Sequence, residues 1–416
     1  MSHIVKHLAI ESTRLLRERR GIGRYVRNVL RELTRQQPHL RFTLYVPRTR
    51  DIAAMRDLLD GLHHGLGDWA SVEPISALAY ADADVVWHPW NLMLHANRRT
   101  ANVVTIHDIA PMLQHDHRWW KVLKRAKYRR RYARTIARAD GLITISHFTR
   151  QEIIERFPAP EDKLAVTLLA ADDLALSAPD DRSVLQRIAQ DGGYFLSVGG
   201  QEARKNLSTL YDAMDRLWSR GVRVPLVQCG PGLSSETRAV QARTPWLRHV
   251  GYVTDAQLVT LYRHATALVF PSRYEGFGLP VLEAMRSGAP VVCSSASSLP
   301  EVAGAAALSV PWDDTEALAA SMQRLAEDSR LQDDLRARGH AQAATFSWAR
   351  TASETFEAMQ RAVERHRVHH APHSLQAMVQ PLLRALTRPT RARPLSPLAS
   401  GTAVRAATSL HEATNR

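Results

Sequence analysis

The sequence predicts an α/β protein built from two Rossmann-like, doubly wound domains that face each other across a cleft. Two observations carry this prediction. Short apolar runs alternate with longer helical patterns through most of the 416 residues, as in parallel sheets that are covered by helices. Several of these runs are apolar on consecutive residues, which is typical of strands buried on both faces of a sheet.

The apolar runs place five or six strands in the first half of the chain and five in the second. The runs lie at residues 5–10, 41–46, 83–88, 102–107, 141–146, 194–199, 225–230, 266–271, 289–294 and 306–311. Between them, residues 22–36, 206–221 and 255–265 have the apolar spacing of amphipathic helices. Ligands of such folds bind at the carboxyl ends of the strands, so the loops that follow the strands are the candidate site.

A stretch rich in Pro, Ala and Asp, residues 159–183, separates the two halves. We therefore expect a first domain at 1–180 and a second at 185–345. Residues 346–368 predict a last long helix, with Ser347 as its N-cap. Residues 369–416 are basic and rich in Pro, Ser and Ala, which predicts a disordered tail.

Composition favours a globular protein of the cytoplasm. The chain is 45% hydrophobic and 23% charged, and it has no run of about 18 apolar residues that would predict a membrane span. Its first residues lack the apolar core of a signal peptide. Cys229 and Cys293 each end an apolar run, which predicts buried thiols and neither a disulfide nor a metal site. No metal is expected.

The net charge of +14 is unevenly distributed. Residues 118–138 contain ten Lys or Arg and no acid, and the chain from Arg361 onward has nine Arg against Glu364 and Glu412, a net +7. Such basic segments favour an anionic partner, such as phosphate groups, anionic lipid or nucleic acid. A solvated helix face explains residues 118–138 equally well.

The loop in "SVGGQEARKNLSTL" follows a strand and opens a helix. Gly199 and Gly200 allow close approach of a ligand to the backbone, and Arg204 and Lys205 bring two positive charges. The helix that starts near Asn206 adds the partial positive charge of its N-terminus. These features predict a diphosphate site, although an ordinary strand-to-helix turn is the alternative.

The loop in "RYEGFGLP" also follows a strand. Its glycines leave the backbone N–H groups of Phe277, Gly278 and Leu279 free to face a ligand. In the helix that follows, Glu283 lies on the face that looks back toward this loop, where a carboxylate can accept two hydrogen bonds from a diol such as a ribose. An ion pair with a neighbouring arginine, for example Arg286, is the alternative, and the spacing does not decide between them.

Two further strand ends are candidates. Gly21 and Gly23 lie where a helix begins after the first strand, so the amides of this turn are candidates for contact with a phosphate or a sugar hydroxyl; a flexible loop is the alternative. His107 ends a buried strand and is a candidate to hydrogen-bond a substrate hydroxyl or to carry a proton. A structural histidine is the alternative there.

Taken together, these segments resemble family 4 of the retaining glycosyltransferases, which have the GT-B fold. "EGFGLPVLEAM" with "GAPVVCSSASSLPEVAG" looks like the family's pair of glutamates eight positions apart, here Glu275 and Glu283. "VGGQEARKNL" resembles its diphosphate segment, "TIHDIAP" its histidine segment, "GIGRYVRNVLREL" its first loop and helix, and "FSWARTASETFEAM" its crossing helix. The resemblance covers about residues 4–365.

The resemblance implies a role for each candidate residue. The donor would be a nucleotide-diphospho-sugar held mainly by the second domain, with Glu283 on the ribose. Glu275 and the amides of the residues from Phe277 to Leu279 would hold the donor sugar, and His107 would lie near its anomeric carbon. Arg204 and Lys205 would neutralise the leaving diphosphate, so that neither a metal nor a cofactor is needed. Gly200 stands where family members often have an arginine, which leaves Arg204 to supply that charge.

The resemblance further implies a retaining, metal-independent hexosyltransferase that works by a front-face mechanism. "GIGRY" and "EARKN" are similar to bacterial mannosyltransferases, which favours mannose from GDP-mannose. The acceptor would be a lipid-linked or surface-polysaccharide glycan, bound by the first domain. The protein would contact anionic lipid at the inner face of the membrane, and no nucleic acid is expected. A GT-B sugar epimerase and a non-catalytic protein that binds sugar nucleotides are the alternatives.

Overall fold

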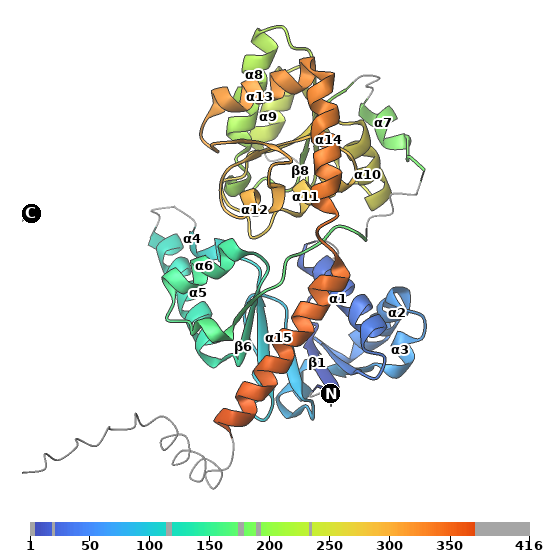
Figure 1. Ribbon diagram of the computed structural model, residues 1–416, viewed down its shortest axis with the longest axis vertical. Coiled ribbons are helices and arrows are strands. Elements are labelled where there is room, and N and C mark those ends of the chain that lie inside the picture. The colour runs from blue at the N-terminus through green and yellow to red at the C-terminus, as the bar shows by residue number, and fades with distance from the viewer. Residues whose placement is uncertain are drawn as a thin grey trace, which may run out of the picture. The chain divides into compact units, whose positions relative to one another are not determined.

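The computed structural model describes residues 5–18, 21–113, 119–173, 179–188, 193–232 and 235–370 (Figure 1). The predicted tail falls almost entirely on residues 371–416, which lie outside the described residues. Within the described part, two parallel sheets with flanking helices confirm the predicted α/β class. The predicted domain limits, 1–180 and 185–345, stay predictions.

The first sheet has seven parallel strands in the order β3-β2-β1-β4-β5-β6-β7. Its order reverses beside β1, which pairs with β2 on one edge and β4 on the other, so the loop after β1 lies at the point where such sheets bind ligands. The strands are β1 (His7–Glu11), β2 (Arg41–Val46), β3 (Ser71–Pro74), β4 (Val85–His88), β5 (Ala101–Ile106), β6 (Gly141–Thr144) and β7 (Leu164–Val166).

Helices connect these strands. The first, α1, covers the predicted residues 22–36, and its apolar face is buried through Tyr25, Val26, Val29 and Leu33. The helices of this part are α1 (Ile22–Gln36), α2 (Ile52–Leu62), α3 (Leu66–Trp69), α4 (Ala110–Leu113), α5 (Trp119–Arg138) and α6 (His147–Arg156). Residues 119–138 of the basic run thus form α5, whose described lysines and arginines are exposed.

The second sheet has six parallel strands in the order β10-β9-β8-β11-β12-β13. The strands are β8 (Phe195–Val198), β9 (Leu226–Cys229), β10 (Leu247–Gly251), β11 (Ala267–Phe270), β12 (Val291–Ser294) and β13 (Leu308–Val310). Its helices are α7 (Ser183–Ile188), α8 (Leu207–Ser219), α9 (Ser235–Arg243), α10 (Asp255–His264), α11 (Leu279–Arg286), α12 (Leu299–Ala303), α13 (Thr315–Glu327) and α14 (Ser329–Ala343).

The strand count corrects the sequence prediction, because β3, β7 and β10 were missed. All three are edge strands, which have a neighbour on one side alone and need fewer apolar side chains. β10 contains the exposed Arg248, and the three residues of β7 are only half-buried. β7 also lies inside the stretch that was predicted to separate the domains.

The last described helix, α15 (Trp348–His369), follows the second sheet in the chain but packs against the first (Figure 1). Ser347 caps it as predicted, since its Oγ accepts a hydrogen bond of 3.2 Å from the Arg350 amide. Thr351 donates a hydrogen bond to the Leu168 carbonyl at 2.6 Å. A Cβ atom added to Gly141 would lie 2.8 Å from the Ala362 Cβ, so helix and strand are in close contact.

Both cysteines are buried and free, as predicted, and burial raises the pKa of the Cys293 thiol to about 12. Within the described residues, every helix is too short or too polar to pass through a bilayer.

Two histidines, His88 and His107, are buried at the carboxyl ends of β4 and β5, and burial lowers the pKa of each to about 4. Both therefore stay neutral in the folded protein, whereas in the unfolded chain they bind protons near pH 6.5. Between these values the unfolded state holds more protons, so stability falls as the pH falls from 6.5 toward 4.

We expect His88→Gln to reduce this acid sensitivity by about 1.4 kcal/mol per pH unit in that window. Urea unfolding at a series of pH values measures the slope. His64→Gln, at an exposed position, is the control for the substitution itself. Equal slopes for His88→Gln and the original protein would contradict the burial argument.

Candidate active site

The loop between β8 and α8 presents Arg204 and Lys205. This loop lies close to the loop after β9: a Cβ atom added to Gly230 would lie 2.1 Å from the Gly199 carbonyl oxygen. Asn206 then adopts a left-handed conformation with φ 58° and donates through Nδ2 to the carbonyls of Pro271 and Trp312, at 3.0 and 2.6 Å. These bonds hold the two basic residues against the loop after β11.

Arg204 and Lys205 both bind Glu275. Arg204 Nη1 lies 2.8 Å from Oε2, and Lys205 Nζ lies 2.8 Å from Oε1. Burial opposes ionisation of Glu275, but Lys205 and Arg204 hold its pKa below the ordinary value. Lys205 also lies over the Phe270 ring, 4.7 Å from its centre, and shares a small cavity with Gly200. The structure thus brings four predicted site residues together.

The backbone from Gly276 to Leu279 is held by its carbonyl groups. Ser298 Oγ donates to the carbonyls of Glu275 and Phe277 at 2.9 and 2.7 Å. Gly278 has φ 112° at the start of α11, a conformation that favours glycine. In the described part of the chain, the N–H groups of Phe277, Gly278 and Leu279 donate to no protein acceptor. They remain available to an anion or a hydroxyl at the helix N-terminus.

His107 borders this loop, since a Cβ atom added to Gly276 would lie 2.1 Å from the His107 carbonyl oxygen. Its Nε2 is 2.8 Å from the Pro89 carbonyl. A carbonyl only accepts hydrogen bonds, so Nε2 carries the proton and Nδ1 is an acceptor in the neutral ring. Burial lowers the pKa of His107 to about 4, which favours a hydrogen-bonding role over a proton-carrying role near neutral pH.

Asp108 is a site residue that the sequence reasoning did not single out. Burial raises the pKa of its carboxyl group, and Arg204 opposes that rise most strongly, while Glu275 adds to it. Charged residues of the second domain therefore influence the pKa of Asp108, which lies just after β5. Its place beside His107 at a strand end was the available signal.

The glycines at the start of α1 position Arg24. Gly21 has φ 56°, and a Cβ atom added to Gly23 would lie 1.7 Å from the Glu18 carbonyl oxygen, so no side chain fits there. Arg24 follows directly and pairs with Asp173 at 2.6 Å and with Glu283. These glycines thus place the guanidinium of Arg24 in the site. The sequence analysis did not identify Arg24, although it lies within "GIGRY".

Glu283 is buried and already has partners. Arg24 contacts Oε1, and the Tyr262 hydroxyl donates to Oε2 at 3.0 Å. The ion pair that the sequence left open therefore forms, but with Arg24 of the first domain and not with Arg286. Asp173 completes the cluster, since it also accepts hydrogen bonds from Asn28 Nδ2 at 2.8 Å and Trp348 Nε1 at 2.9 Å.

Among the described residues, no three His, Cys, Asp or Glu side chains lie together in a group that could hold a metal ion.

Comparison with known proteins places this site in context. Residues 183–342 match the family model described as glycosyl transferases group 1, and residues 19–170 match the model of glycosyltransferase family 4. The chain is 36% identical over 285 residues to the O-antigen chain mannosyltransferase B of Escherichia coli. The aligned region covers 66% of this chain and 74% of the E. coli protein.

Two further proteins are similar to this chain, one in sequence and one in fold. The serotype-specific mannosyltransferase WbdA of Escherichia coli is 30% identical over 277 residues, and the match spans 63% of this chain and 34% of WbdA. Anabaena HepE, solved in complex with UDP and glucose, superposes with a TM-score of 0.64 at 16% identity over 85% of this chain and 98% of HepE. That similarity shows a shared fold, and it confirms the predicted GT-B architecture.

Removal of Arg24 would leave the buried Glu283 and the partly buried Asp173 without their cation. We expect Arg24→Met to lower the free energy of unfolding by about 3 kcal/mol. Combination with Glu283→Gln should give less than the sum of the single effects, by about 1 kcal/mol, because the two groups interact. Urea unfolding of the four proteins measures this difference.

Arg35 is the matched control on the same helix, since its pair with Glu32 is exposed. Arg35→Met should change stability by less than about 0.5 kcal/mol. Strict additivity of Arg24→Met and Glu283→Gln would show that the two side chains do not interact in solution.

Proposed function

Because the chain belongs to family 4 of the glycosyltransferases, we propose that it transfers mannose from GDP-mannose to a lipid-linked or surface-polysaccharide acceptor. We further propose that the configuration at the anomeric carbon is retained and that the reaction takes place in the cytoplasm, at the inner face of the membrane. The observation that carries the proposal is the buried Glu275 held between Arg204 and Lys205, beside the unpartnered amides of the loop from Phe277 to Leu279.

The comparisons support a sugar transfer over the two alternatives. The E. coli relatives are named as mannosyltransferases, which favours mannose over other hexoses and favours transfer over epimerisation or simple binding. HepE was solved with UDP and glucose, which supports a nucleotide-diphospho-sugar as the kind of donor. The link to O-antigen in one relative's name supports a surface glycan as the acceptor.

Mechanistically, the bond between the anomeric carbon and the phosphate oxygen breaks while a bond to the acceptor oxygen forms. Negative charge grows on the leaving diphosphate, and preorganised donors stabilise such charge most effectively. In the proposal, Arg204, Lys205 and the N–H groups of the 277–279 loop take this role in place of a metal. The acceptor proton passes to the departing phosphate oxygen, so no protein base is required.

The remaining side chains orient the donor. Glu275 would share its oxygens between the two cations and the sugar hydroxyls, and His107 Nδ1 would accept a hydrogen bond from the sugar. Glu283 would hold the ribose, for which Arg24 has to release or share its carboxylate. This last step makes donor binding depend on a contact between the domains.

A thermal-shift screen tests the donor. We expect GDP-mannose to raise the melting temperature more than UDP-glucose, UDP-N-acetylglucosamine or GDP alone, since a ligand stabilises the state that binds it. Free mannose should have no effect, because it lacks the diphosphate. A larger shift with UDP-glucose would reassign the donor, and no shift with any sugar nucleotide would count against the enzyme proposal.

Transfer itself depends on the charge cluster. We expect Glu275→Ala and Lys205→Ala each to lower kcat/KM by a factor of about 100 or more, since single charge-stabilising groups contribute on that scale. Product formation from radiolabelled GDP-mannose, with and without EDTA, measures both rate and metal dependence. The exposed Arg216 is the control. Unchanged turnover in Lys205→Ala, or loss of activity in EDTA, would refute the proposed mechanism.

A further inference from the structure

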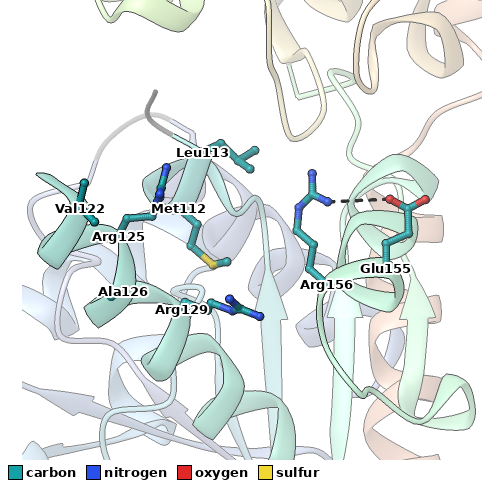
Figure 2. Close-up of a pocket in the computed structure, with 8 residues that line it drawn as sticks. All are labelled: Met112, Leu113, Val122, Arg125, Ala126, Arg129, Glu155 and Arg156. Atoms are coloured by element: carbon teal, nitrogen blue, oxygen red, sulfur yellow. Dashed lines mark ion pairs between the residues drawn. The ribbon is translucent and has the colours of Figure 1, made fainter. Parts of the chain in front are cut away.

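A second candidate site lies in the first domain, outside the charge cluster around Glu275. A pocket of about 620 Å³ opens between α4, the first half of α5 and the end of α6 (Figure 2). Met112, Leu113 and Val122 form an apolar part of its wall. Neighbouring apolar side chains also face solvent, with Val122 41% and Leu123 61% exposed.

The rest of the wall is cationic. Arg125 and Arg129 come from α5 and Arg156 from α6, on opposite sides of the pocket (Figure 2). Arg156 is already neutralised by Glu152 at 2.6 Å and lies 3.9 Å from Glu155, the one acid of the lining. Arg125 and Arg129 have no ion-pair partner among the described residues. Two positive charges therefore remain for a ligand.

The spacing of these two arginines is unfavourable by itself. Like charges four residues apart lie on the same helix face and weaken the helix. An anion that binds both guanidinium groups would turn this repulsion into two charge-assisted hydrogen bonds, and arginine forks match phosphate oxygens well. The pocket thus combines a place for a phosphate with an adjoining apolar wall.

The pocket is also linked to the reaction centre. Arg156 binds Glu152, and the Tyr274 hydroxyl interacts with the same carboxylate. Tyr274 directly precedes Glu275, and its hydroxyl accepts a hydrogen bond of 3.2 Å from the Ile109 amide, next to Asp108. A ligand in the pocket therefore lies beside the elements that carry the proposed transfer site.

We propose that this pocket binds the phosphate-bearing, hydrocarbon end of the acceptor. Arg125 and Arg129 hold a diphosphate group, and the hydrocarbon chain lies against Met112, Leu113 and Val122. The sugar end of the same molecule extends past Asp108 toward the donor. The choice of an acceptor as the occupant rests on the proposed function; the recognition of a diphosphate amphiphile rests on the pocket alone.

Farnesyl diphosphate, a short amphiphilic diphosphate, is the probe. Titration calorimetry is carried out on the full chain with Lys205→Ala, which weakens diphosphate binding at the donor site. We expect the further change of Arg125→Ala with Arg129→Ala to weaken binding at least about tenfold, given the usual strength of hydrogen bonds between charged groups. Inorganic pyrophosphate should bind more weakly than farnesyl diphosphate, since it lacks the apolar part.

Arg131→Ala is the matched control. Arg131 is exposed on the same helix but points about 200° away from Arg129, at about 100° per residue. Equal losses in Arg131→Ala and in the double variant would reduce the effect to the general charge of α5 and overturn the proposal. Equal affinity for pyrophosphate and farnesyl diphosphate would overturn the apolar part.

A vesicle arm separates a single bound molecule from a membrane surface. If Arg125→Ala with Arg129→Ala abolishes flotation with phosphatidylglycerol vesicles but leaves farnesyl diphosphate binding intact, the pocket is part of a membrane contact and the proposal is wrong. The donor readout is independent: stabilisation by GDP-mannose should be the same in the double variant and the original protein. Its absence in both would refute the proposed function without touching the pocket.

Discussion

Glu275 and Glu283 are buried carboxylates of the candidate site, and each has a cation beside it. An ionised carboxylate in a dry site is costly unless it is paired and hydrogen-bonded. The cations follow glycines: Arg204 and Lys205 follow Gly199 and Gly200 after β8, and Arg24 follows Gly21 and Gly23 in the first turn of α1.

The same requirement joins the two sheets. Arg24 belongs to the first domain and Glu283 to the second, and Asp173, in the chain that leads from one to the other, completes their cluster. A second contact has a similar logic: Glu301 of α12 accepts hydrogen bonds from the amides of His147 and Phe148 at the start of α6. A carboxylate at a helix N-terminus is stabilised by the helix dipole. Interactions between groups of opposite charge or partial charge thus connect the two domains at two places.

The sequence was a good guide to the interior and a poorer one to the edges. Buried strands such as β5 and β11 show as unbroken apolar runs, whereas the edge strands β3, β7 and β10 carry polar or half-buried residues and gave no signal. At the candidate site, local motifs singled out Glu275, Lys205 and His107, which stay predictions. The partner of Glu283 could not be found in this way, since Arg24 and Glu283 are 259 positions apart and only the folded chain brings them together.

The return of α15 to the first sheet has a consequence for synthesis. Trp348, Thr351 and Ala362 contact residues of the first domain that leave the ribosome roughly two hundred residues earlier. Until α15 emerges, the face of the first sheet around Gly141 stays uncovered while the whole second domain is made. Domains usually fold in order as they are translated, but here the first one is completed last, so a chain that stops before residue 348 exposes an apolar surface that chaperones and proteases recognise.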